Sequence, residues 1–183
     1  MSMEPRAKHE IKHMTYAAVC LALAIVLPFV AGHIPQIGKM LCPMHLPVLL
    51  CGFITNPWWA LAVGFIAPIL RHFLFAMPPY PSFAAMAFEL AVYGLVSGIL
   101  YRRLPAKKGY IYITLLSAMV LGRVVSGIAM AILLQAGGGH YTFAAFIAAN
   151  VTTSIPGIIL QIILIPVLVM ILEKAGIAHR HRK

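Results

Sequence analysis

The chain has 183 residues, of which 62% are hydrophobic and only 10% are charged, and its mean hydropathy is +0.93. A soluble domain usually carries about 25% charged residues, so the composition excludes that class and indicates an integral membrane protein. The apolar runs are long and continuous, which favours transmembrane helices over a barrel of alternating strands. The net charge of +10 does not indicate nucleic-acid binding, because the basic residues flank the apolar runs instead of forming one polar face.

Apolar runs bounded by proline, glycine or charged residues predict an all-α fold with six transmembrane helices in a single membrane domain, 1–183. The predicted spans are, in chain order, about 14–32, 43–55, 57–76, 82–101, 110–135 and 143–172. The second span is short, and Pro156 and Pro166 are candidate kinks in the long last span. The weakest boundary is the TNPWW segment around Asn56, where a tight turn has to separate the second and third spans.

The basic residues predict the orientation of the spans through the positive-inside rule. With six spans, the tails 1–13 and 173–183 share a side with the loop between the fourth and fifth spans. That side holds Arg6, Lys8, Lys12, Arg102, Arg103, Lys107, Lys108, Lys174, Arg180, Arg182 and Lys183, whereas only Lys39, Arg71 and Arg123 lie elsewhere. We therefore expect both termini in the cytoplasm and the chain in the plasma membrane. No small-residue cleavage site follows the first run, so we expect no removable signal peptide.

Charged and amide side chains within the spans mark the candidate site. Arg71 lies about six residues before the outer MPPYPS turn and Glu89 about seven residues after it, so both lie about 10 Å below the outer surface. Arg123 lies beyond the midpoint of the fifth span, and Asn150 lies about eight residues inside the outer end of the sixth. Such side chains usually face a bundle interior or a wet cavity. The sequence therefore predicts a polar pocket that opens to the outside.

The roles of these residues stay open at this point. Arg71 and Glu89 fit either the wall of a pocket or an interhelical salt bridge. One carboxylate does not neutralise two arginines, so Arg123 favours an anionic or strongly hydrogen-bonding ligand. The outer loops and the fourth span add three candidate contacts, Lys39, His45 and Tyr93.

Pairs of small residues spaced by four let helix backbones approach closely in lipid. They occur at Ala18 and Ala22 in AVCLA, in ALAVG of the third span and in GLVSG of the fourth. From about Thr15 to Leu172, the chain resembles the substrate-binding S components of energy-coupling factor (ECF) vitamin transporters. The resemblance is carried by these small pairs, the six short-looped spans, the basic ends and the segments PMHLPVLLCGF and FELAVYGLVSGILY.

The resemblance implies a bacterial membrane protein that captures a vitamin-like solute near its outer surface, under a lid formed by residues 33–42. It also implies that Ala18 and Ala22 dock a transmembrane coupling subunit that is driven by two cytoplasmic ATPases. No GxxxxGK[ST] loop occurs, so the chain is not expected to be an enzyme and ATP hydrolysis falls to the partners. We expect no cofactor and no resident metal. Pantothenate, pyridoxine-like compounds, thiamine precursors and riboflavin all remain candidate solutes.

Other classes of protein fit parts of the pattern. A metal permease fits the eight histidines and the three-residue spacing of Cys42 and His45. A proton-coupled carrier or a membrane-embedded enzyme fits Glu89, although no GxSxG, HExxH or paired-carboxylate arrangement supports a reaction.

Overall fold

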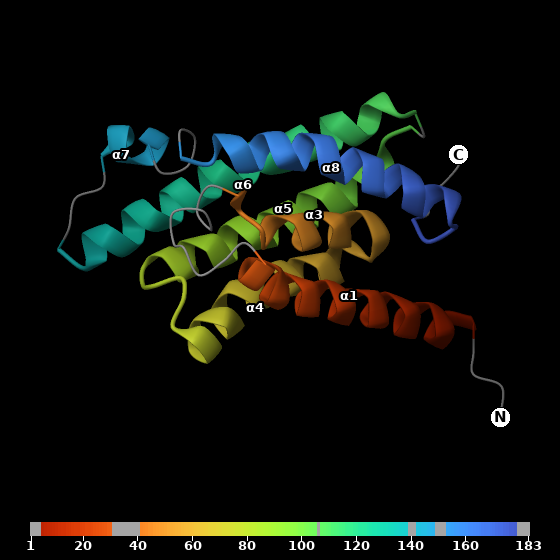
Figure 1. Cartoon of the computed structure of the whole chain (residues 1–183), viewed down its shortest axis with the longest axis horizontal. Helices are drawn as coiled ribbons and strands as arrows, with labels where there is room; N and C mark the ends of the chain where they lie inside the picture. Colours follow the sequence, from red (N-terminus) through yellow and green to blue (C-terminus); the bar gives the residue numbers. More distant parts are fainter. Residues whose placement is uncertain (1–4, 31–40, 106, 139–141, 149–152, 179–183) are drawn as a thin grey trace.

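A computed structural model describes residues 5–30, 41–105, 107–138, 142–148 and 153–178, and its regular structure there is entirely helical (Figure 1). The all-α prediction is therefore confirmed for these parts of the chain. The helices are α1 (Pro5–Val30), α3 (His45–Ile54), α4 (Pro57–Phe75), α5 (Ser82–Arg103), α6 (Gly109–Ala136), α7 (Phe143–Ile147) and α8 (Ile155–Lys174).

Within the described residues, α1, α4, α5, α6 and α8 are long and apolar enough to cross a membrane. The predicted second span corresponds to α3, which is apolar but has only ten residues. At 1.5 Å per residue α3 is about 15 Å long, half of the roughly 30 Å hydrocarbon core. The six predicted runs therefore correspond to five long helices and one short helix that does not cross the core by itself.

Two predicted boundaries differ from the structure. The first helix begins at Pro5 and not near residue 14, because proline fits the first helical turn and the polar segment after it continues the helix. The predicted last span is divided into α7 and α8. Pro156 lies in the first turn of α8, where proline is favoured, so its prediction as a kink is wrong. Pro166 does lie inside α8.

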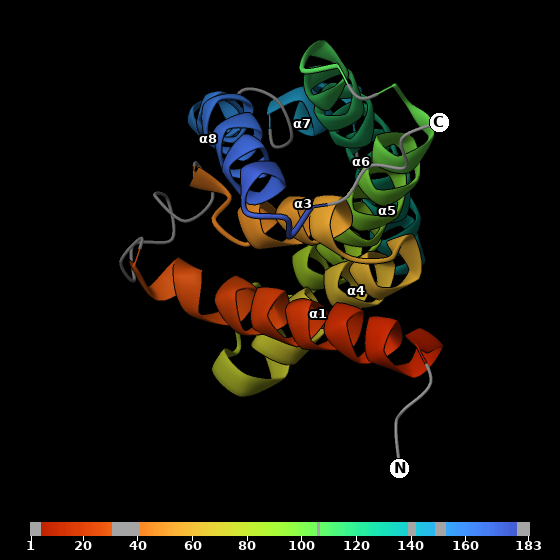
Figure 2. The same cartoon turned by 90° about the vertical axis from the view of Figure 1, so that its right-hand side faces the viewer.

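The bundle has two distinct ends (Figure 1). The start of α1, the connection from α5 to α6 and the end of α8 lie together at one end, which we call the inner end. The basic residues in the connection and at the end of α8 therefore gather there, namely Arg102, Arg103, Lys107, Lys108 and Lys174. In Figure 2, α1 lies along one side of the bundle, where it contacts α3 and α4 and is distant from α6.

A tight turn separates α3 from α4, as the TNPWW segment predicts. Asn56 is extended and Pro57 is the first residue of α4. The guanidinium of Arg102 donates hydrogen bonds to the backbone oxygens of Thr55 and, at 3.4 Å, Gly52. A cation at a helix C-terminus compensates the partial negative charge of the last carbonyls. Arg102 thus ties the end of α3 to α5.

Small residues bring α4 and α5 into close contact. A Cβ atom at Gly64 would overlap the backbone carbonyl of Leu90, and one at Gly94 would overlap the carbonyl of Ala60. The small pairs of the third and fourth predicted spans therefore serve packing within this molecule.

The small pair in α1, Ala18 and Ala22, does not face the neighbouring helices α3 and α4. Ala17, Cys20 and Ala24 are buried against α3 and α4, whereas Ala18 and Ala22 are exposed. The described part of the chain thus leaves this small-residue face of α1 uncovered, in contrast to the pairs in α4 and α5.

Candidate polar site inside the bundle

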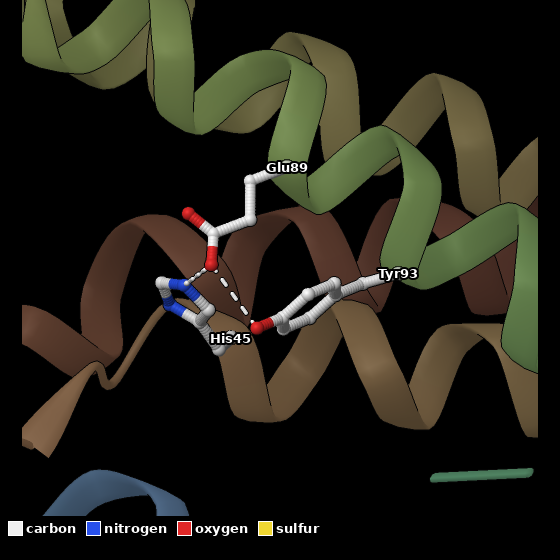
Figure 3. Close-up of polar contacts among 3 residues, drawn as sticks. All are labelled: His45, Glu89 and Tyr93. Carbon is white, nitrogen blue, oxygen red and sulfur yellow. Dashed lines mark hydrogen bonds and ion pairs between the residues drawn. The ribbon is translucent and has the colours of Figure 1, made fainter. Parts of the chain in front are cut away.

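A carboxylate lies inside the apolar bundle with two polar partners (Figure 3). Glu89 on α5 is buried, and its side chain is only 7% exposed. Its Oε1 atom accepts a hydrogen bond from the Tyr93 hydroxyl at 3.0 Å and lies 3.6 Å from Nε2 of His45. The second carboxylate oxygen points away from both partners (Figure 3). These three residues, which we call the Glu89 cluster, form the centre of the candidate site.

The secondary structure explains how the three side chains meet. Glu89 and Tyr93 are four residues apart on α5, so they share one face of that helix. His45 is the first residue of α3, and the short length of that helix starts it deep inside the bundle. The positive end of the α3 dipole therefore lies on the carboxylate side, which favours a negative charge there. The His45 and Tyr93 rings also pack edge to face with centroids 5.4 Å apart.

The next helix, α6, closes another side of the Glu89 cluster. Gly122 has no side chain, and a Cβ atom there would overlap the Tyr93 ring. One residue further, the charge of Arg123 acts on both Glu89 and Tyr93. Ser126 is buried on the same helix and also faces the carboxylate. The structure therefore brings together four predicted site residues, Glu89, Tyr93, His45 and Arg123.

Cys42 and Ser154 approach the same region from the turn before α3 and the residue before α8. Cys42 has a positive φ of 46°, so it lies outside the helical geometry that the metal-ligand spacing with His45 assumed. Among the described residues, no group of three or more His, Cys, Asp or Glu side chains is placed to hold a metal ion.

Arg71 does not join Glu89. Its guanidinium donates a hydrogen bond to the Ile25 backbone oxygen at 2.7 Å. It also lies over the rings of Phe29 and Phe75, at 4.9 and 5.6 Å from their centroids. Arg71 therefore ties the end of α1 to α4, and of the two alternatives the Arg71–Glu89 salt bridge is not the one observed. The two side chains turn toward different helices.

Some predicted positions lie outside the described residues, namely Lys39, Asn150 and the lid loop except for its last two residues.

Sequence reasoning missed two buried polar residues, Ser126 on α6 and Gln161 on α8. Gln161 is fully buried at the centre of the apolar segment IPGIILQIILIPVLV. An amide within a membrane span is a signal of the same kind as a charge, and a search for all polar side chains in the spans would have found it.

Long apolar helices that enclose a carboxylate, an imidazole and a guanidinium define the class as a membrane protein with a candidate polar site in its interior. The comparison with protein-family models gives the family. Residues 12–169 match the family described as ECF transporter, substrate-specific component, and the chain belongs to it. Comparisons with curated proteins and with solved structures gave no match. Members of this family are the substrate-binding subunits of transporters and not enzymes, which agrees with the resemblance drawn from the sequence.

Proposed function

We propose that this chain captures a vitamin or vitamin-like micronutrient from outside the cell and passes it to a transmembrane coupling subunit driven by two cytoplasmic ATPases. Family membership supports a substrate-binding role. The single observation that carries the assignment of the site is the Glu89 cluster. A buried carboxylate is costly in an apolar bundle and is usually kept for function.

The roles within the site follow from the contacts. Glu89 holds a polar or positive group of the solute through the carboxylate oxygen that faces neither His45 nor Tyr93. Arg123 balances the carboxylate and contacts an anionic or polar group. Arg71 braces the wall of the pocket through α1 and does not reach the solute. Lys39 and Asn150 are proposed as further contacts from the outer loops.

The orientation is proposed from the distribution of charge. Basic residues gather at the inner end of the bundle, where α1 begins and α8 ends. The positive-inside rule assigns that end to the cytoplasm of a bacterial cell. The outer half of the bundle then receives the solute. The exposed pair Ala18 and Ala22 is proposed to dock the coupling subunit, because small residues let two helices approach closely in lipid.

The experiment that tests the function is mass spectrometry of small molecules released from the gently purified protein. We expect one solute in near-stoichiometric amount from the unmodified chain and at least about tenfold less from the Glu89→Gln variant, since hydrogen bonds to a buried charge contribute about 1.5–3 kcal/mol. Glu173→Gln is the matched control, because Glu173 also accepts a hydrogen bond from a tyrosine, Tyr101 at 2.7 Å, but at the inner end. No released solute, or equal loss in both variants, would contradict the assignment.

A proton-coupled carrier is the second candidate, because a buried His45–Glu89 pair is also suited to exchange a proton. The two functions differ in their energy source. Uptake by cells that survives ATP depletion but stops with an uncoupler would favour the carrier. Uptake that stops with ATP depletion supports the ECF importer.

A further inference from the structure

Gln161 on α8 is a second polar feature in the interior of the bundle. Its side chain is fully buried, and neither amide atom has a hydrogen-bond partner among the described residues. More than nine in ten buried polar groups in folded proteins have a partner. A buried carboxamide with neither atom satisfied by the described residues is suited to bind a polar group of a solute.

Gln161 lies well inside its helix, as two residues of the candidate site do in theirs. It is 13 residues before the inner end of α8, and Glu89 is 14 residues before the inner end of α5. Arg123 is 14 residues from the inner end of α6. At 1.5 Å per residue each lies about 20 Å along its own helix from the inner end of that helix. Three helices thus carry a polar side chain far from their inner ends.

The side chain of Gln161 also faces the interior. Gly157, Gln161 and Ile165 form the buried face of α8, whereas Ile159 and Ile163 are exposed. This buried face packs against α3 and α6, which carry His45 and Arg123. Gln161 therefore lies on the face of α8 that packs into the bundle, next to the helices that carry His45 and Arg123.

His45 provides a further buried polar atom without a hydrogen-bond partner among the described residues. Its Nε2 atom faces the Glu89 carboxylate, and its Nδ1 atom is turned away from Glu89 (Figure 3) and has no hydrogen-bond partner among the described residues. A carboxylate beside Nε2 favours the tautomer that is protonated there, which leaves Nδ1 as an acceptor. Two helices in contact, α3 and α8, thus each carry a buried polar group without a hydrogen-bond partner among the described residues.

We infer that Gln161 is a solute-binding residue that recognises an uncharged edge carrying a hydrogen-bond donor beside an acceptor. The carboxamide has an NH₂ donor and an oxygen acceptor in one plane, so such an edge satisfies both atoms at once. Lactams, cyclic imides and aminopyrimidines have this edge, whereas a carboxylate offers acceptors only. The Nδ1 atom of His45 takes a further donor from the solute. This inference rests on the proposed function and deepens it by naming the chemistry of the solute.

The test is a competition among four probes at equal concentration, measured by native mass spectrometry of the purified full chain. Thiamine has an aminopyrimidine edge and riboflavin has an imide edge, whereas pyridoxine and pantothenate have no adjacent donor and acceptor of this kind. We expect thiamine or riboflavin to be retained in preference to the other two. Preferential retention of pyridoxine or pantothenate, or retention of none of the four, overturns the inferred edge.

Gln161→Met tests the residue itself, because it keeps the length of the side chain and removes both polar atoms. We expect the retained probe to fall at least about tenfold, since the solute edge loses its partner. We also expect the melting temperature of the solute-free protein to rise, because an unsatisfied buried amide is removed. Gln135→Met, at an exposed position on α6, is the matched control and changes neither value.

A Gln161→Met variant that retains the probe as tightly as the unmodified chain overturns the inference. A variant that loses the probe and also melts at a lower temperature overturns it as well, because the residue is then structural. The proposed function is judged separately by the solute released from the unmodified chain, and it survives either of these results.

Discussion

The exposed small-residue face of α1 predicts that transport and solute binding are separable by mutation. Ala18 and Ala22 are exposed, so replacing both by leucine adds side chains that meet lipid and none of the described residues. Surface substitutions of this kind change the free energy of unfolding by about 0.5 kcal/mol or less. In a close helix–helix contact, each enlarged side chain costs about 1–3 kcal/mol. Two sites together therefore weaken docking by about 2–6 kcal/mol, or roughly 30-fold or more.

The assay is co-purification of the coupling subunit and the two ATPases from membranes that express the double variant. We expect loss of the partners and of uptake, with the melting temperature and the retained solute unchanged. Ala136→Leu is the matched control, because Ala136 is an exposed alanine at the end of α6. If the double variant assembles and transports normally, α1 is not the docking face. If it loses solute or unfolds, the separation of binding from docking is wrong.

Three further predictions concern stability and are measured by thermal unfolding in detergent. Gly94→Ala lowers the free energy of unfolding by about 1–3 kcal/mol, because the added Cβ atom meets the backbone of α4. Gly109→Ala is the control and has no such effect, because a Cβ atom there has nothing within 4 Å. Equal effects of the two substitutions would contradict the packing account. Arg102→Gln costs about 1.5–3 kcal/mol through loss of the charged cap on α3, and an unchanged melting temperature would refute that role. Arg71→Met costs about 1 kcal/mol and leaves the retained solute unchanged, so loss of solute would make Arg71 a contact.

Hydropathy predicted where the middle helices lie, because it reports the boundary between lipid and water. The third, fourth and fifth predicted spans agree with α4, α5 and α6 within two residues at each end. The same signal failed at α1, whose first turns are helical but polar, since hydropathy detects the membrane and not the helix. It failed again before α8, which begins at Ile155 within the predicted last span.

The sequence predicted the position of the site along the spans, but only some of its side-chain contacts. Counting residues from the ends of the spans correctly brought Glu89 and Arg123 to one layer. The direction in which Arg71 points depends on how α4 is rotated against α1 and α5, and glycines such as Gly64 determine that packing through contacts far apart in the sequence. The spacing of residues along the sequence does not predict this rotation of α4. Gln161 was missed because the search within the spans covered charged side chains, Asn150 and Tyr93 but not the other polar side chains.

The most direct test of the account is an experimental structure of the purified chain with its retained solute, determined in a membrane mimic. We predict density for a small molecule in the layer of the Glu89 cluster, within roughly 3.5 Å of Glu89 or Arg123. Density for the solute in another part of the bundle, with the Glu89 cluster closed over its own hydrogen bonds, would contradict the central claim.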